Sequence, residues 1–327
     1  MTAGYEVSAR LCRAVDSGLR ARGWHSTGAV GPFGACAAGS LLLDLDRAGI
    51  AHAFGIAASG AGGLFAFLPE GASVRHAHGA WASANGLVAA LLAAAGMTGP
   101  TRVLEGKDGY LSAYTAAFDP SFIAAPSPVV TGTYEILGTY HKLYASCGHA
   151  YPSITAALSL REKVASKLDA VKKIEARVYK ASAALTNPAP RSVEEAKFSL
   201  PFLLAIAFVH GDLSRRAMCM ENINDPRVRD LAGRVTVGED EKIAADFPRL
   251  RSAELVLTMA DGSEVRQYVD APLGMPENPV SWKELEEKFR DAADGIFSAR
   301  QATRIIGTVR EVDHLVSIVE LTRLLRI

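Results

Sequence analysis

The chain has 327 residues, and its 35 Lys and Arg balance 35 Asp and Glu, so the formal net charge at pH 7 is zero. A neutral chain has no overall field that would draw it to nucleic acid or to an anionic membrane surface, so we expect neither as a partner. Hydrophobic residues make up 49% of the sequence. That content supports a sizeable core and, at this length, two domains.

The four cysteines, Cys12, Cys36, Cys147 and Cys219, are far apart and form no CxxC pair. Their spacing indicates neither a disulfide framework nor a zinc or iron–sulfur site, and reduced thiols fit a cytoplasmic location. The most apolar stretch, 86–96, is too short to span a bilayer. The N-terminus lacks the basic and apolar segments of a signal peptide, so none is predicted.

The first 125 residues show helical periodicity throughout, interrupted by glycines. Four helices and a short fifth piece are predicted there, over 5–21, 32–43, 47–59, 76–95 and near Tyr110. Alanine and glycine dominate three stretches within this region, 35–39, 57–63 and 82–96. Such helices can approach closely and pack in a crowded all-helical layer.

The first of these helices is amphipathic. Its apolar stripe repeats every 3.6 residues, at Val7, Leu11, Val15 and Leu19. The three basic residues of this helix are predicted to face solvent: Arg10, Arg13 and Arg20.

A proline-containing segment, 120–128, marks a change in character, because proline disfavours helix continuation. We predict a helical domain over 1–135 and an α+β domain over 136–311. The last apolar helix, 314–325, has too little polar surface to stand alone. Residues 312–327 are therefore predicted to return to the helical domain.

The second half mixes helices and strands, which predicts an α+β class there. Ser281 followed by Glu284 forms a capping box that opens one amphipathic helix. The predicted elements are a strand over 171–179 and helices over 153–167, 193–209, 227–232 and 282–293.

The clearest strand signal lies over 252–269. Leu255, Leu257 and Met259 alternate with polar residues before Asp261 and Gly262. An alternating run that ends in a glycine-containing turn is typical of a β-hairpin.

One of the eight histidines, His25, lies in a glycine-bracketed turn between two predicted helices, Gly23-Trp24-His25-Ser26-Thr27-Gly28. From such a turn, a side chain can reach a cleft on a rigid scaffold. A lone loop histidine is more often an ordinary surface residue, so the pattern alone leaves both interpretations open.

A second basic segment, Arg75-His76-Ala77-His78-Gly79, lies at the start of a predicted helix. Its side chains and the free N–H groups of that helix can together hold a carboxylate, or the segment can be an exposed basic loop with a capping role. His76 and His78 are spaced so that they point apart on a helix, and no acidic residue nearby completes a ligand set. No metal site is therefore predicted.

A third segment, 140–152, holds a lysine, two histidines, three tyrosines, a serine and a cysteine at the predicted crossing between domains. This polar density exceeds what a linker needs. Cys147 has no nucleophile motif and also fits a packed small hydrophobe. Ser59 likewise lacks a GxSxG context.

These three segments, in this order, together with residues 195–201 and the terminal helices, make the chain resemble the MmgE/PrpD family. Members of that family include 2-methylcitrate dehydratase, cis-aconitate decarboxylase and an iminodisuccinate epimerase. The resemblance implies a large helical domain, a smaller α+β lid, a cleft between them, a homodimer, and no metal or organic cofactor.

The resemblance also implies roles for single residues. His25 matches the family's active-site histidine in a G-[FW]-H segment, and Lys142 matches a lysine at the lid entrance that holds a substrate carboxylate. Arg75 falls where some members have lysine, which keeps the charge but changes its geometry. Further substrate contacts are predicted from polar residues of or near these segments: Ser26, Ser59, His78, Ser146, Cys147 and His149.

On this basis we expect a cofactor-independent lyase of the 2-methylcitrate dehydratase type, which eliminates water from a small 2-hydroxy di- or tricarboxylate. His25 serves as acid or base, while Arg75 and Lys142 stabilise the enediolate-like charge. Cys147 and Ala184 fall where the decarboxylase has histidine and tyrosine, which disfavours that kind of decarboxylation. An epimerase, an isomerase and a decarboxylase of a related dicarboxylate are the alternatives.

Family members also carry, ahead of the position of Met1, a helical segment with an active-site aspartate and a further histidine. The resemblance therefore implies that this chain is the C-terminal part of such an enzyme and lacks the acidic partner of His25. A separately encoded N-terminal piece is one expected partner. A non-catalytic role of the chain is the other alternative.

Overall fold

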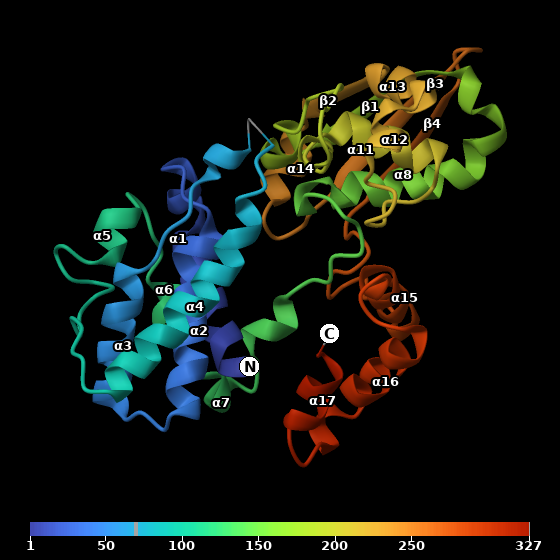
Figure 1. The fold of residues 1–327 in the computed structure, drawn as a ribbon. Coiled ribbons are helices and arrows are strands. Elements are labelled where there is room, and N and C mark those ends of the chain that lie inside the picture. The colour runs from blue at the N-terminus through green and yellow to red at the C-terminus, as the bar shows by residue number, and fades with distance from the viewer. Residues whose placement is uncertain (69–70, 327) are drawn as a thin grey trace. The chain divides into compact units, whose positions relative to one another are not determined.

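The computed structural model describes residues 1–68 and 71–326. The chain divides into two compact units, Met1–Thr139 and Tyr140–Ile327. The first is helical, and the second combines helices with a four-stranded sheet, so the predicted fold class is confirmed (Figure 1). None of the helices in the described residues is both long enough and apolar enough to cross a membrane.

Four long helices build the first unit: α1 (Thr2–Ala21), α2 (Ser26–Leu42), α3 (Arg47–Ser59) and α4 (Arg75–Ala94). α2 lies among the others and packs against α1, α3 and α4 (Figure 1). The short elements of this unit are η1 (Phe65–Phe67), α5 (Tyr110–Tyr114), α6 (Ser121–Ala124), α7 (Pro128–Thr131) and η2 (Glu135–Gly138).

Small residues allow α2 and α4 to approach closely, as the composition predicts. A Cβ placed on Gly86 of α4 would lie 2.3 Å from the carbonyl oxygen of Pro32 on α2, and one placed on Gly31 would lie 2.8 Å from the Cβ of Ala82. Both distances are too short for real Cβ contacts, so a side chain at either glycine would force the two helices apart.

The start of α2 differs from the prediction. The helix begins at Ser26, and Pro32, the predicted start, lies inside it. Proline has no N–H, so the carbonyl of Gly28, one turn earlier, lacks its helical donor. The N–H of Gly62 supplies that donor at 3.1 Å. Because Pro32 has no N–H, the Gly28 carbonyl is available to bind the loop after α3.

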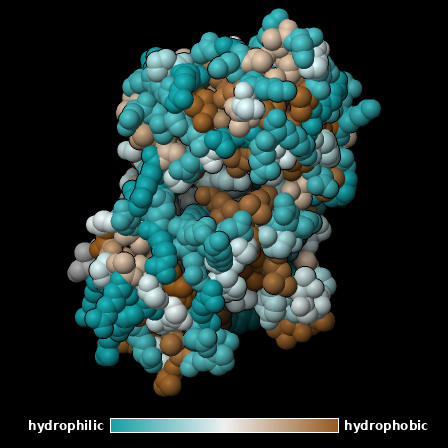
Figure 2. Space-filling model, turned by 90° about the vertical axis from the view of Figure 1, so that its right-hand side faces the viewer, coloured by the Kyte–Doolittle hydropathy of each residue, from teal (hydrophilic) through white to brown (hydrophobic). Residues whose placement is uncertain are grey.

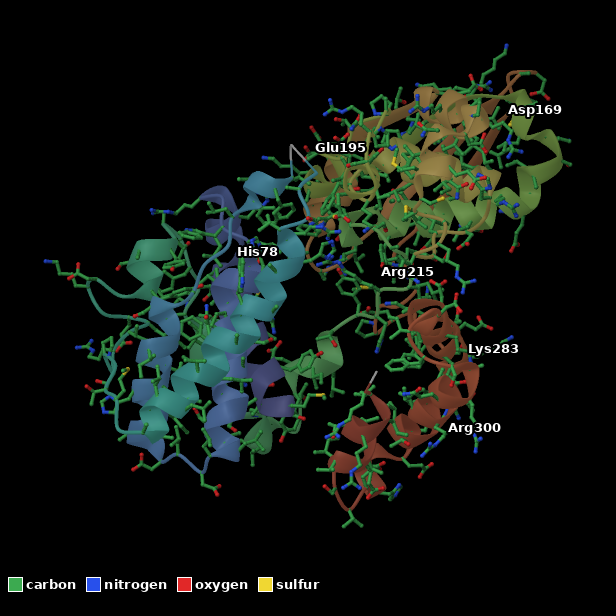
Figure 3. The ribbon with its side chains drawn as sticks, viewed as in Figure 1. His78, Asp169, Glu195, Arg215, Lys283 and Arg300 are labelled. Carbon is green, nitrogen blue, oxygen red and sulfur yellow. The ribbon has the colours of Figure 1, made fainter. Side chains whose placement is uncertain are left out.

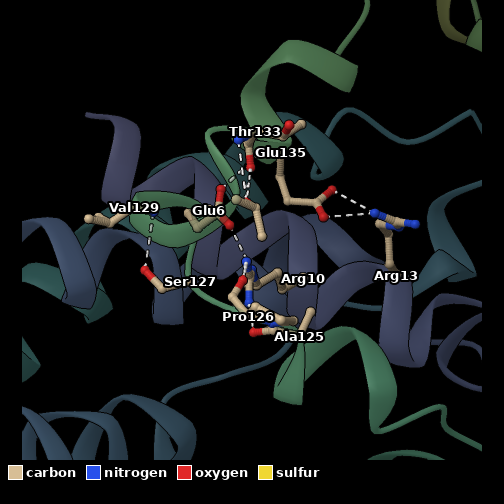
Figure 4. Close-up of polar contacts among 10 residues, drawn as sticks. Glu6, Arg10, Arg13, Ala125, Pro126, Ser127, Val129, Thr133 and Glu135 are labelled. Atoms are coloured by element: carbon tan, nitrogen blue, oxygen red, sulfur yellow. Dashed lines mark hydrogen bonds and ion pairs between the residues drawn. The ribbon is translucent and has the colours of Figure 1, made fainter.

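Arg10, predicted to face solvent, is instead tied down on α1, and its side chain is only 15% exposed. Its Nε donates to Glu6 at 2.6 Å, and its terminal nitrogens donate to the carbonyls of Ala125 at 2.6 Å and Pro126 at 2.8 Å (Figure 4). Glu6 also accepts the N–H of Glu135 at 2.9 Å. These bonds fasten the end of the first unit to α1.

The sheet of the second unit runs in the order β2-β1-β3-β4, with strands β1 (Val171–Val178), β2 (Val235–Glu239), β3 (Ala253–Met259) and β4 (Glu264–Val269). β1 is parallel to β2 and antiparallel to β3. β3 and β4 form the predicted hairpin, whose turn contains Gly262 at a φ of 85°. The short β2 strand escapes prediction because its alternation is interrupted by Gly238.

Two helices pack on this sheet and on each other. α8 (Tyr151–Val164) packs against β3 and β4, while α11 (Leu200–Val209) packs against α8, β2 and α13 (Pro226–Gly233). The other helical elements are η3 (Gly148–Ala150), η4 (Ala165–Ala170), α9 (Lys180–Ala183), α10 (Val193–Ala196), α12 (Met220–Asn224), α14 (Glu241–Asp246), α15 (Trp282–Ala293), α16 (Ala299–Arg310), η5 (Val312–His314) and α17 (Val319–Leu324).

The predicted single helix over 193–209 is wrong, because the chain breaks between α10 and α11. Ser199 caps α11 by accepting the N–H of Phe202 at 3.1 Å, and a proline occupies the first turn. The capping box of Ser281 and Glu284 at the start of α15 is confirmed.

The predicted final helix over 314–325 is also wrong in extent. The segment forms η5 and the shorter α17, which packs against the unpredicted α16 within the second unit. Its return to the first unit stays a prediction.

Large apolar side chains reach the surface of both units, and brown patches of them are visible between hydrophilic residues in Figure 2. In the first unit several lie on α2 and α4: Leu41, Leu42, Trp81, Leu87, Val88 and Leu91.

Candidate active site

The backbone around His25 is fixed by a short antiparallel pairing. The N–H of His25 donates to the carbonyl of Gly63 at 2.9 Å, and Trp24 and Leu64 form an isolated β-bridge. The N–H of Phe65 returns a bond of 2.8 Å to Gly23. Gly63 has a φ of +112°, a conformation that side-chain-bearing residues rarely adopt. The turn predicted around His25 is therefore held against a second glycine-rich loop.

His25 is hydrogen-bonded to His78. The two Nδ1 atoms are 2.8 Å apart. His25 lies just before α2, and His78, labelled in Figure 3, lies in the first turn of α4. His78 is only 4% exposed. Since a bond between two ring nitrogens requires one proton between them, one histidine donates at Nδ1 and the other accepts.

Aromatic rings enclose the same imidazole. The rings of Phe65 and Phe67 meet His25 nearly edge to face, at centroid distances of 4.9 and 5.4 Å. The guanidinium of Arg20 lies over the Phe65 ring, 3.7 Å from its centroid. This packing excludes water from one side of the imidazole and places the Arg20 guanidinium on the ring next to it.

Burial, followed by charge interactions with His78, Arg75 and Arg20, lowers the pKa of His25 from 6.5 to about 4, against an opposing effect of Asp16. His25 is therefore neutral at pH 7, the form that can remove a proton. Within residues 1–68 and 71–326, its other ring nitrogen, Nε2, has only a weak contact of 3.4 Å with the Thr27 hydroxyl.

Two predicted substrate-binding serines of this unit have local partners. Ser26 donates to the carboxylate of Asp16 at 2.6 Å, and the hydroxyl of Ser59 lies 3.4 Å from the Gly55 carbonyl of its own helix. The charge of Asp16 also reaches His25. An acidic group of this chain, Asp16, thus acts on His25 through its charge, which the resemblance does not imply.

The other predicted residues lie in the second unit. Lys142 is exposed, and its carbonyl accepts a bond from Lys288. The hydroxyl of Ser146 is buried with no hydrogen-bond partner in the described part of the chain. The N–H of Cys147 donates to a carbonyl at 2.8 Å, and His149 Nδ1 lies 3.0 Å from the hydroxyl of a buried tyrosine.

The structure thus brings together His25, Ser26, Arg75 and His78 in one unit, and Lys142, Ser146, Cys147 and His149 in the other. A single site formed by both groups stays a prediction. Of residues 1–68 and 71–326, no three His, Cys, Asp or Glu side chains are placed to hold a metal ion.

Sequence reasoning misses the residues that complete each group. In the second unit, the tyrosine bonded to His149 is Tyr179, which stacks on Phe247 at 4.4 Å. Arg251 lies over the ring of Tyr140, 5.2 Å from its centroid. In the first unit the missed residues are Arg20 and Asp16. None belongs to a motif, so only the packing reveals them.

Two family models match the chain: the MmgE/PrpD N-terminal domain over residues 1–123 and the MmgE/PrpD C-terminal domain over residues 144–314. The chain is 29% identical over 339 residues to cis-aconitate decarboxylase of Aspergillus terreus, an alignment that covers 98% of this chain and 69% of that protein. It is 26% identical over 332 residues to cis-aconitate decarboxylase of Homo sapiens, with coverages of 99% and 67%. A 2-methylcitrate dehydratase-like protein, oryR of Aspergillus oryzae, is 25% identical over 181 residues, with coverages of 51% and 36%.

Proposed function

The chain belongs to the MmgE/PrpD family, and from this membership and the state of His25 we propose that it is a lyase that acts on small di- or tricarboxylic acids by abstracting an alpha proton. One observation carries the choice of chemistry: a half-buried histidine that is neutral at pH 7, with two guanidinium groups acting on it. A neutral imidazole is ready to accept a proton, and cations next to it favour a carboxylate substrate.

In the proposed elimination, Nε2 of His25 takes the proton on the carbon next to a carboxylate. The electrons of that C–H bond form the new C=C bond, and the C–O bond of the 2-hydroxy group breaks. The leaving hydroxide takes a proton from solvent and becomes water. Arg75 stabilises the negative charge that builds up on the carboxylate oxygens. Lys142 is proposed to hold a second carboxylate of the substrate.

Decarboxylation is the second candidate, because the matched relatives include proteins named cis-aconitate decarboxylase. In that reaction a C–C bond breaks, CO2 leaves, and the carbanion needs a proton from an acid. A histidine with a pKa of about 4 carries little of the acidic form at pH 7. The protonation state of His25 therefore favours elimination or epimerisation, both of which begin with proton removal.

The test offers 2-methylcitrate and cis-aconitate separately to the chain, in D2O, and follows unsaturated product, CO2 and deuterium in recovered substrate. Unsaturated product from 2-methylcitrate supports elimination. Deuterium without unsaturated product supports an epimerase, and CO2 supports a decarboxylase. No reaction with either probe overturns the proposal.

The role of His25 is tested with His25→Asn, and the matched control is His314→Asn, whose histidine is exposed in the second unit. We expect at least about a 100-fold loss of kcat for His25→Asn, as for a removed general base, and none for the control. If an active chain keeps its turnover in His25→Asn, another residue is the base.

A further inference from the structure

We propose that His78 is a positioning residue: its Nδ1 accepts the Nδ1 proton of His25 and so keeps the Nε2 lone pair of His25 free to act as the base. This inference rests on the proposed function. It assigns His78 a role through His25, in place of the direct substrate contact that the sequence predicts.

The 2.8 Å bond between the two Nδ1 atoms can have either of two directions. If His25 donates, its proton is on Nδ1 and Nε2 is a free base. If His78 donates, neutral His25 carries its proton on Nε2 and cannot accept another there. Only the first direction is compatible with proton abstraction by Nε2.

The same direction also fits the protonated state. When Nε2 takes a proton, His25 becomes an imidazolium whose Nδ1–H still needs an acceptor, and His78 Nδ1 is already in place. A neutral acceptor steadies this cation without the strong stabilisation that a carboxylate gives. His25 can therefore pass its proton on in the next step.

The surroundings hold His78 in this position. The ring is 4% exposed and packs near Phe67 and Trp81, at centroid distances of 6.0 and 5.9 Å. A Cβ on Gly63 would lie 3.2 Å from His78 Nδ1. The same glycine accepts the backbone N–H of His25. Gly63 thus leaves room for the His78 ring and also fixes the backbone of His25.

The direct test is nitrogen NMR of chain labelled with 15N in the histidine rings, with His25→Asn used to assign the His25 signals. At pH 7 we expect a proton on Nδ1 and none on Nε2 of His25. His78→Phe, which keeps a ring but removes the acceptor, should shift His25 toward the Nε2-protonated form. A wild-type His25 protonated on Nε2 overturns the proposal, whether or not the chain turns over either probe.

In an active chain, His78→Phe should lower kcat by about 10- to 100-fold with little change in KM, as for other groups that orient a reacting residue. His78→Gln, whose amide oxygen can accept, should recover part of the loss. Equal kcat in wild type and His78→Phe contradicts the proposal. Retained circular dichroism excludes misfolding as the cause of a loss.

The pH profile gives a readout that a merely structural role would not change. The charged or titratable groups that act on His25 are Arg20 and Asp16 of α1 and Arg75 and His78 of α4. His78→Asp places an anion next to Nδ1, so the acid limb of kcat/KM should move to higher pH, because an anion favours the imidazolium. An unmoved limb in a folded, active variant contradicts the pairing.

A different observation assigns a ligand to Arg20: we infer that its guanidinium binds a carboxylate of the substrate. The central carbon of the guanidinium lies over the Phe65 ring, 3.7 Å from its centroid, and that ring packs against His25. No acidic side chain in the described ranges forms an ion pair with Arg20. A stacked guanidinium keeps its N–H edge free for a bidentate bond to a carboxylate.

The test compares Arg20→Gln and Arg20→Lys with Arg22→Gln, an exposed arginine two residues further on. Binding of cis-aconitate and of 2-methylcitrate is measured by calorimetry, and KM where turnover is found. We expect about 10- to 100-fold weaker binding for Arg20→Gln, as for a lost charge-assisted bond, an intermediate loss for Arg20→Lys, and none for Arg22→Gln.

Equal affinities of Arg20→Gln and Arg22→Gln overturn this inference. If Arg20→Gln binds the probes more weakly but the wild type turns over neither of them, the carboxylate site is supported and the proposed reaction is rejected. The two failures are therefore distinguishable.

Discussion

The contact between the first turn of α2 and the loop after α3 allows a sharp test by one added methyl group. A Cβ on Gly28 would lie 1.9 Å from the carbonyl oxygen of Gly62. Real Cβ atoms essentially never come within 3.0 Å of such an atom, so Gly28→Ala must displace that loop by about 1 Å or more.

The size of the effect follows from two opposing terms. Overpacking of this kind costs about 1–3 kcal/mol, while replacing glycine by alanine in a helix returns up to about 1 kcal/mol. We therefore expect the free energy of unfolding of the first unit to fall by about 1–2 kcal/mol. Turnover should fall as well, because the displaced loop includes Gly63, which accepts the His25 N–H.

The matched control is Gly62→Ala, on the other side of the same contact. A Cβ there meets no atom within 4 Å, so the change should stay within about 0.5 kcal/mol. Urea unfolding is followed by tryptophan fluorescence in a Trp282→Phe background, which leaves Trp24 and Trp81 of the three tryptophans. If Gly28→Ala and Gly62→Ala unfold at the same urea concentration, the close approach does not exist in solution.

Three further predictions concern other parts of the chain. Glu6→Gln removes the negative charge that accepts from Arg10 and from the Glu135 N–H, so urea unfolding should show a loss of about 1–3 kcal/mol, against no change for exposed Glu320→Gln. Ser281→Ala breaks the capping box of α15, and a loss of about 1 kcal/mol in the stability of the second unit, seen by the fluorescence of Trp282, is expected; an unchanged urea midpoint contradicts it. The lowered pKa of His25, about 4 against 6.5, means that the unfolded chain binds more protons between these pH values, so this stabilising term is complete above pH 6.5 and is lost as the pH falls toward 4. His25→Asn should flatten that part of the curve of urea midpoint against pH, and parallel curves for the two proteins would contradict the shift.

Local patterns predict the elements whose cause lies within a few residues. The capping box joins Ser281 to Glu284, and the hairpin depends on alternation around a turn at Gly262, so both are confirmed. The break before α11 is missed because its apolar residues continue on all sides of the helix. Ser199 followed by Pro201 is the signal that marks the break.

Residues that act through long-range packing are harder to predict. The turn around His25 identifies it as a candidate, but the bond from His25 to His78 joins positions 53 residues apart and depends on how α2 meets α4. His78 is predicted to contact substrate, and its burial instead favours a role behind His25. The helical period predicts that Arg20 faces solvent. Its position over the Phe65 ring is found only in the folded structure.

The glycine-rich stretches connect scaffold and site. Their composition predicts close helix packing, which Gly31 and Gly86 confirm. The same kind of residue at 28 and 63 holds the loop that pairs with the His25 backbone, and Pro32 frees the carbonyl on which that loop docks. The position of the imidazole thus depends largely on glycines, whose lack of a side chain allows these close contacts. A motif of catalytic residue types does not specify where the imidazole lies. Substitutions at these small residues should therefore impair the site even though all of its polar side chains are still present.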